Sequence, residues 1–232
     1  MRRKPPERLA AIAEAAITVF TRLGYRRAQM ADIAAALGVS VGSLYSYASG
    51  KEALAQLALL RLLDFDLAGL DLPHQTNPET ERAILRALAE RTRWPLLEAA
   101  TARFAAPDDV AAELGAIIGE LFDALLASRR LIRFLDACVL HMPAIAAQFL
   151  GQSKGAYLEL LERYLTRRQR QGKLARLGPK PAGDTRALLE QVAWLALHRQ
   201  ADALPPPLDD AEARATAQAF AVAAFAAAAF RP

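Results

Sequence analysis

The segment LGVSVGSLYSYASGKEAL, residues 37–54, constrains the fold of this chain more than any other. At its start, Ile33 and Leu37 lie four positions apart, a spacing that places both on one face of a short helix. Gly38 follows where a helix can end with a residue of positive φ, and Ser40 is suited to cap a second helix. A helix, a glycine turn and a second helix in this order are typical of a helix-turn-helix motif.

The second helix of this motif carries a face without acidic side chains. Its members are small groups, hydroxyls and one aromatic ring, namely Ser40, Val41, Gly42, Ser43, Tyr45 and Ser46, whereas Leu44 and Tyr47 are expected to point inward. Such a face can approach a phosphate backbone, because nothing on it repels a negative charge. The alternative for an isolated glycine turn is a surface loop, but here several signals agree in register.

A third helix is expected to follow the motif directly. Ser49 and Glu52 fit the S-x-x-E capping box, which predicts a helix from about Gly50 with Lys51 in its first turn. A cation in the first turn opposes the helix dipole, so this position is favourable only when an anion lies nearby. A DNA phosphate is therefore the expected partner of Lys51.

At these residues the chain resembles the TetR/AcrR family of one-component transcriptional regulators. The resemblance runs from Arg8 to about Leu54, and it rests on AIAEAAITVF followed by LGY, on ADIAAALGVSVGSLY and on the closing SGKEAL. It implies an all-α fold. Residues 1–51 would form a helix-turn-helix DNA-binding domain, and residues 52–232 a larger helical domain that binds an effector and dimerises.

Two departures from the family pattern bear on the DNA-binding domain. Where the family usually has Thr-Ser before the second helix, this chain has Ala28 and Gln29, which predicts a weaker helix cap and a weaker phosphate contact. Where the family usually has a Phe, this chain has Ala48 after Tyr47. That change removes an aromatic ring that packs the DNA-binding domain against its neighbours, and predicts a looser domain.

The resemblance also implies which side chains contact DNA. By position in the motif, base-edge contacts fall to Val41, Gly42 and Tyr45, and phosphate contacts to Arg27, Gln29, Ser43, Tyr47 and Lys51, with Ser40 on the same face. The charge distribution agrees, because residues 1–51 hold 8 basic and 3 acidic side chains, whereas the remainder holds 21 basic and 22 acidic ones. Positive charge concentrated in one small domain is typical of a nucleic-acid-binding module.

Beyond residue 54 every segment has the periodicity of a helix, and no period-two pattern of a strand persists. Helices are expected over residues 50–70, 79–93, 95–104, 110–125, 131–140, 143–172, 184–199 and 209–230, with a loop over 71–80. Hydrophobic residues make up 53% of the chain, a high share that indicates extensive buried helix faces, one of them shared with a second copy.

The last two expected helices are the candidates for a dimer interface. In the family these helices pair with their copies, which implies dimer contacts from Leu188, Val192, Leu195, Phe220 and Ala224. The alternative is that the final helix packs within its own chain, and both uses can coexist. Residues 215–230 are almost wholly apolar, but they are too few and too rich in alanine to span a membrane.

Family members sense small molecules between helices of the larger domain, and such sites are mostly apolar. The resemblance therefore implies an effector cavity lined by Trp94, Phe104, Phe122, Phe134, Cys138, His141 and Trp194. Taken one by one, these residues are better explained as plain hydrophobic core than as ligand contacts, since aromatic rings at helical spacing fill interiors. No charged residue stands in an apolar segment, which favours a neutral or weakly charged lipophilic effector.

Motifs of the common catalytic sites are absent from the sequence, which has no G-x-x-x-x-G-K-[ST], no H-E-x-x-H and no G-x-S-x-G. Cys138 and His141 lie three residues apart, but a closed metal site needs about four ligands. We therefore expect neither enzyme activity nor a metal or other cofactor. The single cysteine excludes an intrachain disulfide, and the start MRRKPPERLA lacks an apolar run, so a cytoplasmic protein without a secretory signal is expected.

Three classes of function remain open on these grounds. The first is a homodimeric repressor that binds a palindromic DNA operator and is released by a small lipophilic effector. The second is a DNA-binding regulator without a small-molecule effector. The third is a helical enzyme or carrier in which the resemblance of the N-terminal residues is incidental.

Overall fold

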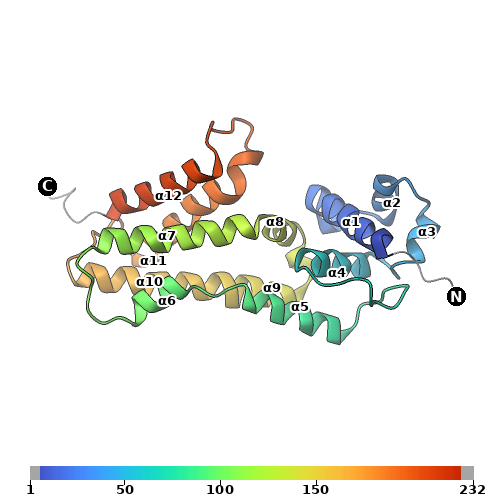
Figure 1. Cartoon of the computed structure of the whole chain (residues 1–232), viewed down its shortest axis with the longest axis horizontal. Coiled ribbons are helices and arrows are strands. Elements are labelled where there is room, and N and C mark those ends of the chain that lie inside the picture. Colours follow the sequence, from blue (N-terminus) through green and yellow to red (C-terminus); the bar gives the residue numbers. More distant parts are fainter. Residues whose placement is uncertain (1–5, 226–232) are drawn as a thin grey trace. The chain divides into compact units, whose positions relative to one another are not determined.

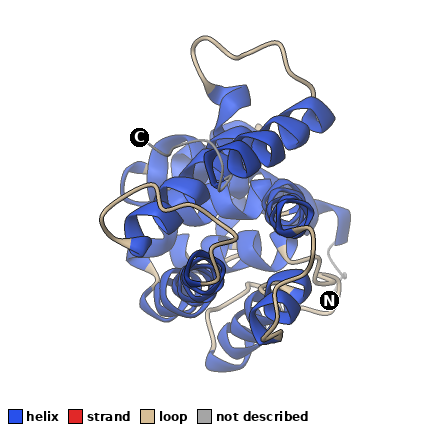
Figure 2. Ribbon diagram, turned by 90° about the vertical axis from the view of Figure 1, so that its left-hand side faces the viewer, coloured by secondary structure: helices blue, strands red, loops and turns tan. Residues whose placement is uncertain are grey.

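The computed structural model describes residues 6–225 of the chain. Helices make up 74% of it and the described residues form no strand, which confirms the all-α class (Figures 1 and 2). The first helices are α1 (Pro6–Arg27), α2 (Met30–Leu37), α3 (Val41–Tyr45), α4 (Lys51–Leu62) and α5 (Pro78–Glu90). They are followed by α6 (Pro95–Ala102), α7 (Val110–Ala127), α8 (Arg129–Cys138), α9 (Pro143–Ala146), α10 (Ala156–Arg170), α11 (Pro181–Ala193) and α12 (Asp210–Phe225).

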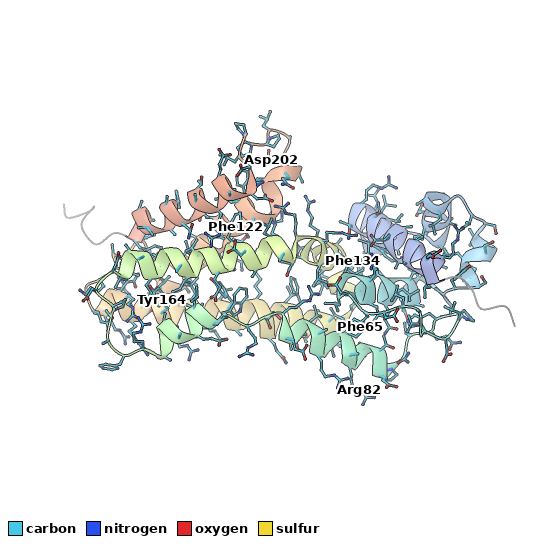
Figure 3. The ribbon with its side chains drawn as sticks, in the orientation of Figure 1. Phe65, Arg82, Phe122, Phe134, Tyr164 and Asp202 are labelled. Atoms are coloured by element: carbon cyan, nitrogen blue, oxygen red, sulfur yellow. The ribbon has the colours of Figure 1, made fainter. Side chains whose placement is uncertain are left out.

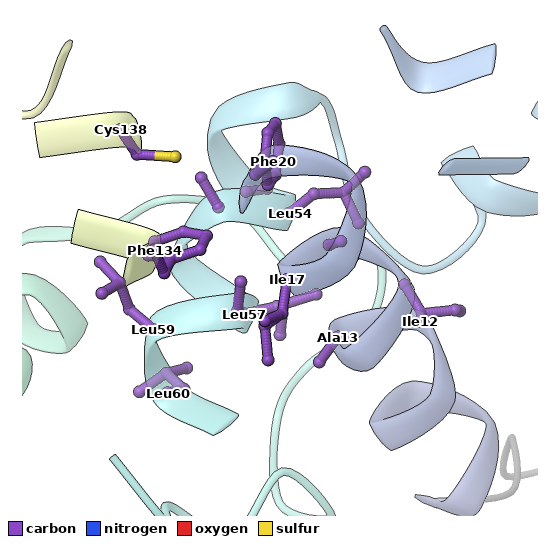
Figure 4. Close-up of a cluster of buried hydrophobic side chains, with 14 of the residues drawn as sticks. Ile12, Ala13, Ile17, Phe20, Leu54, Leu57, Leu59, Leu60, Phe134 and Cys138 are labelled. Carbon is purple, nitrogen blue, oxygen red and sulfur yellow. The ribbon is translucent and has the colours of Figure 1, made fainter. Parts of the chain in front are cut away.

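By packing, the chain forms two compact units, of which the first consists of Met1–Thr92 and Arg130–Leu150. Helix α4 lies at its centre and is apolar nearly all round, as expected for a helix covered on several sides. Its Leu54 and Leu57 are buried among Ile12 and Phe20 of α1 and Phe134 of α8 (Figure 4). The helix that follows the DNA-binding motif is therefore part of the core on which that motif rests.

The second compact unit consists of Arg93–Arg129 and Gly151–Pro232, and it is built around α7 and α12. Gly119 of α7 leaves room for side chains of α12, since a Cβ at this position would meet the Arg214 guanidinium at 2.5 Å. The buried face of α12 is made of Ala213, Ala217 and Ala221, spaced four residues apart. The other alanines of α12 do not serve this packing, because Ala211, Ala215, Ala219 and Ala223 are exposed.

A buried ion pair crosses the interior of the second unit. The Arg168 side chain of α10 is fully buried, and its Nε donates to Oε2 of Glu113 in α7 at 2.9 Å. Arg168 also donates to the carbonyl oxygen of Ala100 in α6 and lies over the ring of Tyr164, which is labelled in Figure 3. One side chain thereby connects three helices, and its charge is compensated where it is buried.

Several helix boundaries differ from the expected ones. Helix α4 ends at Leu62 and does not continue to residue 70, because Asp64 adopts a positive φ of 61° and pairs with Arg91. The expected helix over 143–172 is interrupted by a π-helical segment, Ala147–Gly155, and a second π segment, Trp194–His198, follows α11. Residues 226–230 of the expected last helix lie outside the described residues.

None of the helices among residues 6–225 is both long and apolar enough to cross a lipid bilayer. The two compact units are defined by packing alone, and their bounds say nothing about which residues bind DNA or an effector. The division of function between residues 1–51 and 52–232 therefore stays a prediction.

Candidate nucleic-acid interface

The turn between α2 and α3 has the predicted geometry. Gly38 ends α2 in the left-handed region with φ 65° and ψ 35°, and the Val39 N–H donates to the carbonyl oxygen of Ala34 at 3.0 Å. The Ser40 Oγ accepts a hydrogen bond from the Ser43 N–H at 3.1 Å, which caps the first turn of α3. Both the glycine turn and the serine cap are confirmed.

Helix α3 presents the predicted face outward. Leu44 is buried, whereas Val41 and Tyr45 are 36% and 49% exposed. The neighbouring Ser40, Gly42 and Ser43 are exposed as well, and so are Arg27 at the end of α1 and Gln29 at the start of α2. Tyr47 is half-buried against the core of the first unit.

The start of α2 is capped despite the absence of Thr-Ser. The Gln29 N–H donates to Oδ2 of Asp32 at 2.7 Å, so the carboxylate at the third helical position satisfies the backbone that precedes the helix. Asp32 also lies in the first turn, where a negative charge is favourable. Asp32 thus supports the cap from the helix side, and the weaker cap predicted for Gln29 stays a prediction.

The capping box predicted for Ser49 and Glu52 is wrong. Helix α4 begins after Gly50, and no side chain caps its first turn. The backbone around Ser49 pairs instead with a distant segment. The Ser49 N–H donates to the His74 carbonyl at 2.9 Å, and the His74 N–H donates to the Tyr47 carbonyl at 2.8 Å. Ala48 thus forms a parallel β-bridge with His74, a residue of the α4–α5 connection.

This bridge is a buried one. Ala48 is fully buried and His74 is 3% exposed, and the Nε2 of His74 is hydrogen-bonded to Oε1 of Gln56 in α4 at 2.8 Å. Burial lowers the pKa of His74, because the charged ring would lose its hydration. The small side chain of Ala48 thus lies where two backbone segments meet. At the position where the family usually has an aromatic ring, this chain has backbone hydrogen bonds to the α4–α5 connection.

Lys51 lies at the start of α4, beside the end of α1. Its Nζ is 4.5 Å from the centre of the Tyr25 ring and 3.3 Å from the carbonyl oxygen of Arg26, to which it donates. The Tyr25 ring also stacks on His141 with centroids 5.2 Å apart. Burial, and then the negative charge of Glu52, raise the pKa of Tyr25, so its hydroxyl stays protonated at neutral pH.

The motif matches the family model described as "Bacterial regulatory proteins, tetR family" over residues 12–58. Residues 12–58 are therefore a DNA-binding domain of the TetR type. Two solved TetR-type structures have a similar fold over nearly the whole length of both chains. The ketosteroid transcriptional regulator KstR2 of Mycobacterium tuberculosis has a TM-score of 0.52 and 16% identity, and covers 97% of each chain. SCO3833, a member of the TetR family from Streptomyces coelicolor A3, has a TM-score of 0.52 and 18% identity, with 95% of this chain and 91% of that chain covered. No curated protein matches the sequence.

The seven residues expected to line a TetR-type effector cavity are divided between the two units and differ in burial. Phe134 and Cys138 are core residues of the first unit, where burial raises the pKa of the thiol to about 12. In the second unit Phe122 is buried, and Trp94 packs edge-on against Tyr157. The others are more open: Phe104 is 88% and Trp194 39% exposed, and His141 is exposed beside Tyr25. Hydrophobic periodicity alone does not distinguish these environments.

A cavity of about 410 Å³ lies instead within the first unit, and His141 is the one residue of the expected set that lines it. Its walls come from the end of α1, from α4, from the start of α5 and from residues 141–145. The lining includes Glu52, Gln56 and Glu81, which sequence reasoning missed. These residues are far apart in the chain, and only the return of the α4–α5 connection to α4 places them around one space.

The residues expected at a TetR-type dimer interface divide into two groups. Leu188, Val192 and Leu195 are at most 6% exposed, so they already serve the interior of a single chain. Phe220 is 59% exposed on the outer side of α12, and Ala224 is half-buried. Phe220 and Trp194 are among the exposed apolar side chains of the second unit, and their place in a dimer interface stays a prediction. Within residues 6–225 no three His, Cys, Asp or Glu side chains gather as a metal site would require.

Proposed function

We propose that this protein is a transcriptional regulator that binds a palindromic operator as a homodimer, and that a small lipophilic effector releases it from the DNA. The observation that carries the proposal is the exposed face of α3. A capped helix presents Val41, Ser43 and Tyr45 to solvent with no carboxylate among them. We infer a regulatory and not a catalytic function, because residues 12–58 match a family model of bacterial regulatory proteins.

Dimerisation follows from the symmetry of a palindrome. Two recognition helices must enter successive major grooves, about 34 Å apart, so the protein needs a fixed spacing between two copies. The exposed Phe220 of α12 offers the kind of apolar surface that a second copy can cover. An effector then acts by changing this spacing, and a coupling free energy of about 1–3 kcal/mol would lower operator affinity about 5- to 150-fold.

The proposal is tested by selecting duplexes from a random pool and measuring their affinity by fluorescence anisotropy. We expect a near-palindromic sequence to be enriched. The logarithm of its association constant should fall against the logarithm of salt concentration with a slope of about −5 to −7, if each protomer neutralises about three to four phosphates. Equal affinity for selected and random duplexes at physiological salt would contradict the proposal.

The second candidate function is a DNA-binding regulator without a small-molecule effector. It is favoured by the burial of the expected effector residues, since Phe104 and Trp194 are exposed and Phe122 is wholly within the core. A ligand screen that measures both thermal stability and operator release separates the two candidates. Ligands that stabilise the protein but leave operator affinity unchanged support the second.

A further inference from the structure

We propose that the cavity of the first compact unit binds an organic cation with an apolar body. Its identification as the effector site rests on the proposed function, whereas the binding of the cation does not. The sequence favoured a neutral or weakly charged effector, because no charged residue stands within an apolar segment. The structure changes that expectation by collecting two carboxylates from different helices around one space.

The size and the floor of the cavity suit a small organic molecule. Its volume of about 410 Å³ lies in the range of small-molecule sites, which runs from about 300 to 1,000 Å³. Leu59 of α4, Ile84 of α5 and Ile145 line it, and each of these side chains is at most 4% exposed. An apolar group placed there would therefore rest on a preformed apolar surface.

The charge around the cavity is negative. Glu52 of α4 and Glu81 of α5 both line it, and neither carboxylate forms an ion pair with any residue of the described range 6–225. The neighbouring amide oxygens are already engaged, since Gln56 Oε1 is hydrogen-bonded to His74 and Asn77 Oδ1 accepts from the Thr80 N–H. The carboxylates are thus the negatively charged acceptors that remain for a ligand.

An anionic ligand is disfavoured even though the N-terminus of α5 borders the cavity. Of the first backbone groups of this helix, Pro78 has no N–H, the Thr80 N–H is bonded to the Asn77 side chain, and the Glu81 N–H is bonded to the Asn77 carbonyl. Few donors are left for an anion, and Glu81 itself would repel one. A metal ion is disfavoured as well, because no three metal-ligating side chains gather among the described residues.

An aromatic ring completes the site. Tyr25 lines the cavity, and its ring already attracts one cation, the Lys51 ammonium at 4.5 Å. The same ring is stacked on Phe20 and on His141, so a ligand cation would reach its π face by taking the place of the Lys51 ammonium. A ligand cation held by Glu52 and Tyr25 would repel Lys51 from the ring and from the Arg26 carbonyl. Because Lys51 is a proposed phosphate contact, occupancy of the cavity would weaken operator binding.

The test uses three probes that share a phenylpropyl body: 3-phenylpropyltrimethylammonium, neutral 3-phenylpropanol and anionic 3-phenylpropanoate. Binding to the full-length protein is measured by titration calorimetry without DNA. We expect the ammonium compound to bind at least about tenfold more tightly than the other two. Glu52→Gln and Glu81→Gln should each weaken it by about three- to fivefold, and the double variant should remove its advantage over the alcohol.

Glu79→Gln is the matched control, because Glu79 is an exposed carboxylate in the first turn of α5 that does not line the cavity. Circular dichroism checks that every variant is folded. Equal binding of the three probes, an unchanged preference in the double variant, or an equal effect of Glu79→Gln would each overturn the site. If the cation binds as expected but no duplex is selected, the site stands and the proposed regulatory function fails. If the cation binds and operator affinity falls, operator DNA must weaken cation binding by the same factor.

Discussion

The Lys51 ammonium lies 4.5 Å from the centre of the Tyr25 ring and donates to the carbonyl oxygen of Arg26 at 3.3 Å. These two contacts hold a long, flexible side chain at the start of α4, next to the end of α1 where Arg27 is exposed. A lysine that is already oriented loses less side-chain entropy when it meets a phosphate. The ring of Tyr25 therefore orients Lys51 for the phosphate contact proposed for it.

Replacing Lys51 by alanine should weaken the binding of all duplexes alike, because a phosphate contact carries no sequence information. The log-log salt slope of the dimer should become shallower by about 2, one contact from each protomer. Anisotropy titrations over a salt series measure both effects. Lys173→Ala, which removes an exposed charge after α10, should leave the slope nearly unchanged. A change in the preferred sequence on Lys51→Ala would contradict the assignment.

Replacing Tyr45 by alanine should change the preferred sequence as well as the affinity. Tyr45 is 49% exposed on the outer face of α3, where its ring can reach base edges in the major groove. The measurement is a new selection from the random pool with the variant protein. If Tyr45→Ala selects the wild-type operator and loses affinity equally for every duplex, Tyr45 is a backbone contact.

Ser40 allows helix capping and DNA contact to be separated. Ser40→Ala removes the acceptor for the Ser43 N–H and should lower the free energy of unfolding by about 1 kcal/mol. Ser40→Asp keeps an acceptor at the cap, so stability should be retained, but it places a negative charge on the proposed DNA face. Thermal unfolding and operator titrations together test this. Retained operator affinity in Ser40→Asp would show that this position lies away from the DNA.

The features that could be predicted from the sequence are those whose partners are close in the chain. The Gly38 turn and the Ser40 cap each depend on residues within four positions, and both were correct. Ser49 looked like a cap for the same local reason, but its backbone is paired with His74, 25 residues further on. No local pattern indicates such a partner.

The cavity and the exposure of individual helix faces could not be predicted for the same reason, since both depend on residues that are distant in the chain. Periodicity identifies Leu195 and Phe220 as apolar positions of helices, but it does not say that one is 6% and the other 59% exposed. It likewise treats Phe104, which is 88% exposed, and buried Phe122 alike. The carboxylates Glu52 and Glu81 lack any shared motif, and they meet at one cavity only because α5 returns to α4.

These exposures lead to a test of the dimer. Phe220→Glu should dissociate it to single protomers at micromolar concentration and leave the fold intact, because the ring is 59% exposed within one chain. Leu195→Glu should instead lower stability by several kcal/mol, since it buries an unpaired charge. Light scattering and thermal unfolding measure the two effects. Leu204→Glu, at an 88% exposed position before α12, is the control and should change neither. A dimeric Phe220→Glu protein would place the interface elsewhere.

Cys138 should make stability depend on alkaline pH. Burial raises its pKa from 9.0 to about 12, so between these values the unfolded chain has lost a proton that the folded chain keeps. Stability from this group is complete below pH 9 and is lost as the pH rises towards 12. Cys138→Ala should therefore flatten the decline in the unfolding midpoint over this window, while the buried Tyr157 and Tyr164 contribute equally to both proteins. Parallel midpoint curves for the two proteins would exclude a role for the thiol.

The bridge between Ala48 and His74 restricts where the sequence can be joined to that of a similar protein in a chimaera. A hybrid regulator that takes only residues 1–51 from this chain would leave the Tyr47 carbonyl and the Ser49 amide without the partners they have here. A transplant that runs through residue 77 carries both halves of the bridge, together with Gln56, which holds the His74 ring. The unit that can be exchanged between regulators is therefore longer than the helix-turn-helix, and it ends where α5 begins.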